Sequence, residues 1–237
     1  VELDDDFVEA MRTMLLDAKL SPAFKEQALT LPSEGFLGEQ RSAVNPQAIR
    51  AARRSVYGQL GRRLAGEWQR AYETHATPGA YSPAPGPAGR RALRNLALAY
   101  LAEGGVPGAI ELARQQLAAA TNMTDRQAAL AVLVDSDASD KAEILARLAR
   151  EWQREPLLMN KWFQLQAMAM TRPGEPAVVD RVRRLLAHPG FSLANPNNVF
   201  ALVRSFCMSN EAEFHRRDGA GYALWAEQVL ALDRINP

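Results

Sequence analysis

The sequence has 237 residues, enough to bury a sizeable core in one or two domains, and its 47% hydrophobic and 23% charged residues are ordinary for a globular protein. A net charge of +1 gives no bulk electrostatic reason to bind nucleic acid or an anionic membrane. No apolar run reaches the ~18 residues of a membrane span, so neither partner is expected.

The redox compartment is indicated by the single cysteine. Cys207 excludes an internal disulfide, as suits a reducing cytoplasm, and it lies between Phe206 and Met208 on a mostly apolar helix, where a buried, inert thiol is expected. The first six residues, from Val1 to Asp6, are acidic where an export signal would be basic. We therefore expect a cytoplasmic location.

The first segments have helical spacing. An amphipathic helix is predicted from Asp4 to about Ala18, and Ser21-Pro22 begins a short helix that stops at Leu31-Pro32. A long helix is predicted over residues 45–74. Its expected buried stripe consists of Ile49, Ala52, Val56, Leu60, Leu64, Trp68 and Ala71.

Residues 77–89 hold four prolines and three glycines, a composition that predicts a loop between helices. Because the same helical pattern resumes at Arg90, we interpret this stretch as a surface excursion within a single helical domain of residues 1–237.

Further helices are predicted at 90–103, 107–120, 125–135, 139–154, 157–170, 175–187, 196–208 and 221–235. Thr124 and Gln127 have the spacing of a capping box. Trp68, Trp152, Trp162 and Trp225 stand at core spacing. Short links between amphipathic helices favour antiparallel pairs, so the predicted fold is all-α, an irregular superhelix of the armadillo or HEAT α-solenoid kind.

The sharpest local signals lie between Phe191 and Pro237. Asn195 is a predicted N-cap with Pro196 at the first helical position, followed by Asn197 and an apolar stripe. Asn210 and Glu213 have capping-box spacing. A turn is then predicted, and a last helix opens at Tyr222; the turn residues are Asp218, Gly219, Ala220 and Gly221.

This order of N-P-N, then F-H-x-x-D-G-x-G-Y, then a helix ending in N-P resembles the C-terminal helical domain of bacterial aminopeptidase N, a zinc exopeptidase family. The family usually has arginine where this chain has Asn198, so the contact of that arginine is not expected here. Further landmarks in the same order are Leu29-Thr30-Leu31-Pro32-Ser33-Glu34, Arg94-Asn95, Asn122-Met123-Thr124-Asp125 and Asn160-Lys161-Trp162-Phe163 with Leu165-Gln166-Ala167.

The resemblance implies that the chain caps the zinc site of a parent enzyme that removes N-terminal residues from peptides. The catalytic domain of the same polypeptide and its peptide substrates are then the implied partners. This chain lacks the family's H-E-x-x-H and G-x-M-E-N motifs, and its three histidines (His75, His188 and His215) lie far apart in sequence. We therefore expect no catalytic residue, metal ligand or cofactor here, with zinc held by the parent catalytic domain.

Arg204 and Tyr222 are candidates to line a substrate channel in the parent, although structural packing is the stronger expectation. His215 with Asp218 could form a catalytic pair or, as we favour, a hydrogen bond that stabilises the loop. Resemblance also implies that the helices continue beyond Asn236-Pro237, so we expect a piece that lacks its last helices.

Two other functions stay open from the sequence. A free-standing helical-repeat scaffold would bind a peptide or protein in its concave groove. A nucleic-acid binder would need a continuous arginine stripe, but Arg62 and Arg63 point away from the cluster of Arg50, Arg53 and Arg54, so a solvated face is favoured.

Overall fold

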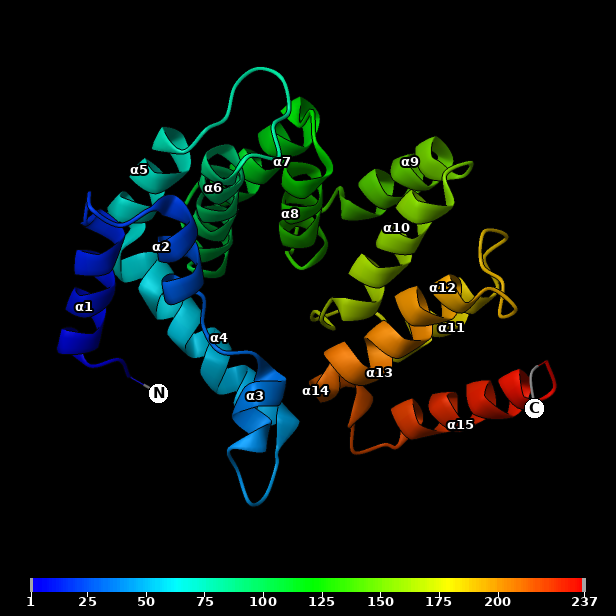
Figure 1. Cartoon of the computed structure of the whole chain (residues 1–237). Helices are drawn as coiled ribbons and strands as arrows, with labels where there is room; N and C mark the ends of the chain where they lie inside the picture. The colour runs from blue at the N-terminus through cyan, green and yellow to red at the C-terminus, as the bar shows by residue number, and fades with distance from the viewer. Residues whose placement is uncertain (1, 236–237) are drawn as a thin grey trace. The chain divides into compact units, whose positions relative to one another are not determined.

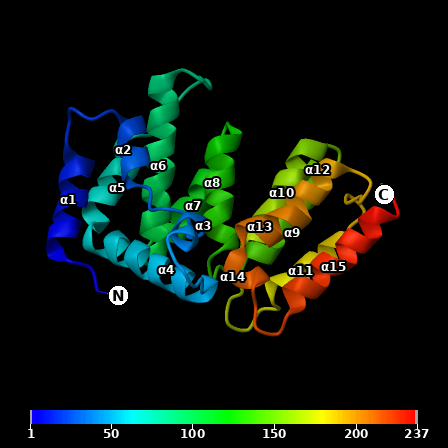
Figure 2. The ribbon, with the colours of Figure 1, turned by 60° about the horizontal axis from the view of Figure 1, so that its bottom comes forward.

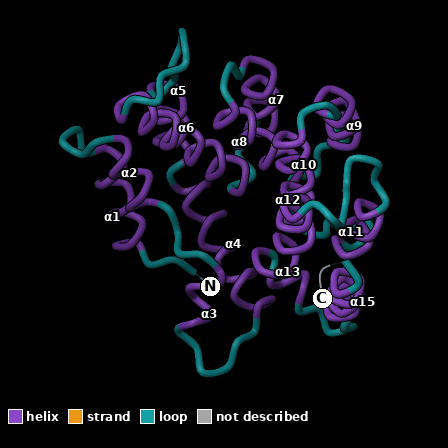
Figure 3. Tube along the Cα trace, turned by 45° about the vertical axis from the view of Figure 1, so that its right-hand side comes forward, coloured by secondary structure: helices purple, strands orange, loops and turns teal. Residues whose placement is uncertain are grey.

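The computed structural model describes residues 2–235, and within this range the chain is helical with no strand (Figure 1). The predicted all-α class is therefore confirmed. Contacts divide the chain into two compact units: unit 1 comprises residues 1–33 and 49–136, and unit 2 comprises residues 34–48 and 137–237. Figure 3 shows the helices and the loops that connect them.

Unit 1 contains six whole helices and most of a seventh: α1 (Asp5–Leu16), α2 (Pro22–Leu29), α4 (Pro46–Arg63), α5 (Ala65–Thr74), α6 (Pro85–Glu103), α7 (Ala109–Ala119) and α8 (Met123–Val134). Helix α6 packs on α2, α5 and α8, and α7 packs on α8. In its core the Tyr100 ring stacks between those of Tyr57 and Trp68, with centroids 4.1 and 4.2 Å away. The buried Tyr100 hydroxyl donates to the Leu29 carbonyl at 2.7 Å, which fixes α2 on α6.

The single long helix predicted over residues 45–74 is wrong, because the chain forms α4 and α5 with a break at Leu64. Backbone angles at Leu64 leave the helical region (φ −116°, ψ 27°). The Leu60 carbonyl accepts from the Leu64 amide and also from the indole N–H of Trp68 at 3.2 Å. A side chain that shares a ladder carbonyl is a known cause of helix distortion, and all three of these side chains are fully buried.

The loop predicted over residues 77–89 is shorter than expected, because α6 already begins at Pro85. Pro85 and Pro87 fall within the first turn of the helix, where the backbone N–H groups have no intrahelical acceptor. Their missing N–H groups therefore cost the helix nothing. Proline content alone predicted a loop over residues that form a helical N-terminus.

The capping box predicted at Thr124 and Gln127 is also wrong, because α8 is capped two residues earlier. The Asn122 Oδ1 accepts from the Asp125 amide at 2.9 Å, and its Nδ2 donates to the Asp125 carboxylate at 2.8 Å. That buried carboxylate also accepts from Asn95 of α6, and Gln116 of α7 donates to the Asp125 carbonyl. Helices α6, α7 and α8 thus share one polar network.

Unit 2 contains a short helix that the sequence did not indicate, α3 (Glu34–Glu39), and the helices from α9 onward. These are α9 (Lys141–Trp152), α10 (Pro156–Met168), α11 (Val178–Leu186), α12 (Pro196–Val199), the π-helix η1 (Phe200–Arg204), α13 (Ser205–Ser209), α14 (Glu211–Phe214) and α15 (Ala220–Asp233). Helix α10 packs on α9, α11, η1 and α13. The fully buried rings of Phe163 and Phe206 lie in this core.

The last helix, α15, is more exposed than the sequence predicts. It packs on α11 and α14, as Figure 2 shows, and buries only Gly221 and Leu224 completely. Trp225 is 43% exposed, so the expectation of four core tryptophans is wrong for this one, whereas Trp68, Trp152 and Trp162 are buried. The predicted end at Asn236-Pro237 lies outside the described residues. No helix in residues 2–235 is both long and apolar enough to cross a membrane.

Candidate functional site

The predicted N-cap at Asn195 is confirmed. Its Oδ1 accepts from the amide of Asn197 at 3.0 Å, and Pro196 occupies the first position of α12. Pro196 and Asn197 are exposed, and Asn195 is half-buried. These three residues therefore define where the helix begins, and the cap itself is a local hydrogen bond.

Asn198 replaces the arginine of the resembled family, and it is a structural residue here. Its side chain is buried, its Oδ1 accepts from the Ser192 amide at 2.8 Å, and its Nδ2 donates to Asn160 Oδ1 at 2.7 Å. The asparagine thus ties the loop before α12 to α10.

Next along the chain, the helix widens into the π-turn η1. The Ser205 hydroxyl donates to the Phe200 carbonyl at 3.0 Å, five residues back. Single π-turns within helices are frequent at functional sites. Arg204 is exposed at this turn, with its guanidinium 5.9 Å from the centre of the Phe200 ring, and Phe200 and Met208 are 56% and 62% exposed.

The capping box predicted at Asn210 and Glu213 is wrong, because both side chains make tertiary contacts instead. The fully buried Asn210 donates through Nδ2 to the carbonyls of Ala167 and Ala169, both at 2.8 Å. Glu213 accepts from the backbone and hydroxyl of Thr171, at 2.9 and 2.8 Å. Together these side chains join α14 to the end of α10 and the segment that follows it.

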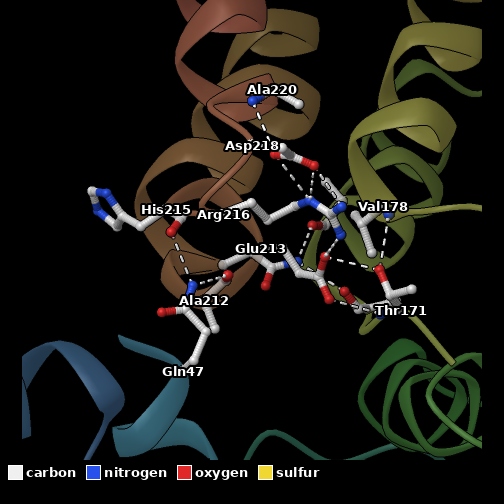
Figure 4. A network of polar contacts seen from close by, with 12 residues as sticks. Gln47, Thr171, Val178, Ala212, Glu213, His215, Arg216, Asp218 and Ala220 are labelled. Carbon is white, nitrogen blue, oxygen red and sulfur yellow. Dashed lines mark hydrogen bonds and ion pairs between the residues drawn. The ribbon is translucent and has the colours of Figure 1, made fainter. Parts of the chain in front are cut away.

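The turn between α14 and α15 is held by an ion pair (Figure 4). The Arg216 guanidinium donates to the Asp218 carboxylate at 2.6 Å, and the Asp218 Oδ1 accepts from the Ala220 amide at 3.1 Å. The hydrogen bond from Arg216, followed by that from the Ala220 amide, lowers the pKa of Asp218. Asp218 is therefore ionised at neutral pH and serves as the acceptor at the start of α15.

The two glycines of this turn are needed for different reasons. Gly219 has φ +73°, in the left-handed region that favours glycine. Gly221 has a negative φ, but a Cβ there would collide with the carbonyl of Phe214. The predicted turn at residues 218–221 is present, and α15 begins at Ala220, two residues before the predicted start at Tyr222.

His215 and Asp218 do not form the hydrogen bond that the sequence favoured. The His215 Nδ1 lies 2.6 Å from the hydroxyl of Tyr222, and its ring also packs edge-on against those of Phe214 and Tyr222. Asp218 pairs with Arg216 instead. The histidine therefore joins an aromatic cluster, and no catalytic His–Asp pair forms.

Sequence reasoning missed Gln47. Its Nε2 donates to the carbonyls of Ala212 and His215, at 2.8 and 2.9 Å, and so caps the C-terminal end of α14 (Figure 4). No local pattern could indicate this contact, because Gln47 and His215 are separated by 168 positions in the chain.

The candidate residues thus form two sets and an isolated position. His215, Asp218, Gly219, Gly221 and Tyr222 meet at the corner between α14 and α15, whereas Asn195, Pro196 and Asn197 begin α12, and Arg204 stands on the exposed side of η1. In residues 2–235, no three His, Cys, Asp or Glu side chains are grouped so that they could hold a metal ion. Burial raises the pKa of the Cys207 thiol to about 12, which makes it a poor nucleophile.

A family model described as a domain of unknown function with ARM repeats (DUF3458_C) matches residues 1–237. The chain belongs to this family. Its ARM repeats agree with the packed helix pairs of both units and confirm the predicted armadillo-like class.

Proteins with similar sequences are named aminopeptidase N, the family that the sequence motifs resemble. The chain is 37% identical over 99% of its length to aminopeptidase N of Caulobacter vibrioides and 35% identical over 97% to that of Escherichia coli. It spans 27% and 26% of those proteins, about a quarter of their length. The chain is also similar to the crystal structure of Legionella pneumophila aminopeptidase A in complex with aspartic acid, with a TM-score of 0.87 at 28% identity over 100% of this chain and 28% of that one. The resemblance to the C-terminal helical domain of aminopeptidase N is confirmed.

Proposed function

We propose that this chain is the helical domain that caps the active site of a zinc-dependent aminopeptidase N and restricts access to it. The parent would remove N-terminal residues from peptides. The observation that carries the proposal is the similarity to proteins named aminopeptidase N over almost the whole of this chain, together with the quarter of their length that it spans. The other three quarters leave room for a separate catalytic domain.

The histidines of residues 2–235 do not fit a zinc site. Each histidine already has a hydrogen-bond partner. His75 contacts the Ala71 carbonyl, His188 accepts from the Gly190 amide, and His215 is hydrogen-bonded to the Tyr222 hydroxyl. The zinc of the proposed parent would therefore be held by residues outside this chain. The contribution of this chain is steric, and its partners are the catalytic domain of the same polypeptide and the peptides that pass beside it.

Two of the candidate channel residues have the exposure that contact with a peptide requires. Tyr222 is 51% exposed, and Arg204 is exposed with its guanidinium near the Phe200 ring. An exposed guanidinium suits the backbone carbonyls and terminal carboxylate of a passing peptide, and an aromatic face can pack on its apolar side chains. We place the protein in the cytoplasm, which the single free and buried Cys207 favours.

The proposal is tested on the longer polypeptide that contains this chain. We expect it to release the chromophore from aminoacyl p-nitroanilides, to lose this activity to a chelator and to regain it with zinc. The 237-residue chain alone, as a control, should release none. Activity that persists through chelation would contradict the zinc mechanism. If the chain were instead encoded as an independent protein that has no aminopeptidase activity, the alternative function of a free-standing binding scaffold would be favoured.

A further inference from the structure

Unit 1 contains a cavity of about 250 Å³ that the proposed function does not use. It lies where the loop before α6, the first turns of α6 and the start of α8 meet. The chemistry of its wall comes mainly from Ser82, Arg90, Arg91, Thr121 and Asn122. No carboxylate is present among the residues that line it.

Arg91 is the feature that points to a ligand. Its side chain is buried, with 4% of the residue exposed, and its Nε has no hydrogen-bond partner. One NH2 group donates to the Ser82 carbonyl at 2.8 Å, and the guanidinium lies 4.7 Å from the centre of the Tyr81 ring. Among the described residues no carboxylate pairs with Arg91.

A buried guanidinium without a paired carboxylate is unusual. Buried arginines are almost always paired with an anion, because desolvation of an uncompensated charge is costly. Each buried donor without a partner also loses the hydrogen bond that it made to water in the unfolded chain. An anion in the cavity would compensate the buried charge.

The surroundings favour an oxyanion in particular. Arg90 brings a second guanidinium to the cavity, and the hydroxyls of Ser82 and Thr121 can donate. The cavity also lies at the N-terminus of α6, a helix of 19 residues whose dipole favours negative charge there. A guanidinium suits the paired oxygens of carboxylate and phosphate better than it suits a spherical halide.

We propose that this cavity binds a small oxyanion, a carboxylate or phosphate group, with Arg91 as its principal partner. We name it the Arg91 site. Nothing in the proposed function of the chain requires it, and it belongs to unit 1, whereas the candidate residues belong to unit 2.

Isothermal titration of the full chain with phosphate and, separately, with acetate tests the proposal, against sodium chloride at matched ionic strength. We expect saturable binding of at least one oxyanion at one site per chain, and none of chloride. Arg91→Met should weaken that binding at least tenfold, or about 1.4 kcal/mol.

Arg94→Met is the matched control. Arg94 lies three residues further along the same helix, donates from Nε to the Tyr72 carbonyl and stacks 4.2 Å from the Tyr72 ring, but it does not line the cavity. Its replacement should leave oxyanion binding unchanged. An equal loss in both variants would show a non-specific effect of charge and overturn the proposal.

Thr121→Glu provides a variant that does not disturb the core, because Thr121 is exposed at the cavity. The added carboxylate should repel the ligand and weaken binding at least tenfold even if Arg91→Met does not fold. Amide resonances that shift with phosphate or acetate should belong to residues 77–82, 90–91 and 121–122. Absence of saturable binding to tens of millimolar, or unchanged binding in Thr121→Glu, would contradict the assignment.

Discussion

At the scale of single residues, the corner between α14 and α15 depends on two glycines with different constraints. Gly219→Ala should cost about 1–2 kcal/mol, because a Cβ is unfavourable at its positive φ. Gly221→Ala should cost more, up to about 3 kcal/mol, because its Cβ would collide with the backbone carbonyl oxygen of Phe214.

Urea unfolding of the two variants checks this order. Gly66→Ala is the control, because Gly66 lies exposed in α5 with a negative φ and open space around its Cα, so alanine should stabilise by about 0.5–1 kcal/mol. Equal stability of Gly221→Ala and the wild type would show that the close approach to Phe214 is wrong.

The buried thiol gives a second prediction at this scale. Cys207 is 4% exposed, and desolvation raises its pKa to about 12, so the thiol is protonated at pH 8 in the folded chain. We expect the native protein to react with Ellman's reagent far more slowly than the urea-unfolded protein, in which the pKa returns to about 8.5. Equal rates in the two states would contradict this burial.

At the scale of elements, local signals predicted the helix starts that depend only on neighbouring residues. Ser21 and Asn195 cap α2 and α12 as expected, because their acceptors bond amides within three positions. Asn210 has the same type of side chain, but it donates to distant carbonyls at the end of α10 and just after it. The spacing of residues along the sequence does not show that distant carbonyls compete for this side chain. The predicted capping box is therefore wrong.

The break at Leu64 and the exposure of Trp225 also depend on contacts that the helical spacing does not include. At the break, the Leu60 carbonyl accepts from both the Leu64 amide and the Trp68 indole. Trp225 is exposed because α15 buries only Gly221 and Leu224 completely. Gln47 is the extreme case, since its partners are fixed only once the chain has folded. The sequence therefore predicted the class of fold and the residues of the corner, but not the contacts that hold the corner in place.

Asn210 supplies the prediction for this scale. Asn210→Ala removes two donors to buried carbonyls and should lower the free energy of unfolding by about 2–4 kcal/mol. Asn210→Asp should cost at least as much, because it places a carboxylate against two carbonyl oxygens. Asn195→Ala, at a half-buried cap, should cost only about 1 kcal/mol.

Chemical denaturation of the three variants measures these differences. If Asn210→Ala were no more destabilising than Asn195→Ala, the link between α14 and the segment after α10 would have no energetic weight.

At the scale of the whole molecule, the role that we propose is one that no residue of the chain performs by itself. The His, Cys, Asp and Glu side chains of residues 2–235 form no candidate metal group, while similarity to proteins named aminopeptidase N covers nearly the entire chain. A helical domain of this kind can act on a reaction through shape, by admitting an extended N-terminus and excluding a folded one.

The most direct test compares two substrates of the longer polypeptide that share one N-terminal sequence, a short unstructured peptide and a folded protein. Release of the N-terminal residue is followed by mass spectrometry, with kcat/KM as the measure. The account predicts that the peptide is processed at least about a hundredfold more efficiently, because the proposed cap would admit only a flexible chain. Equal kcat/KM values for the peptide and the folded protein would contradict it.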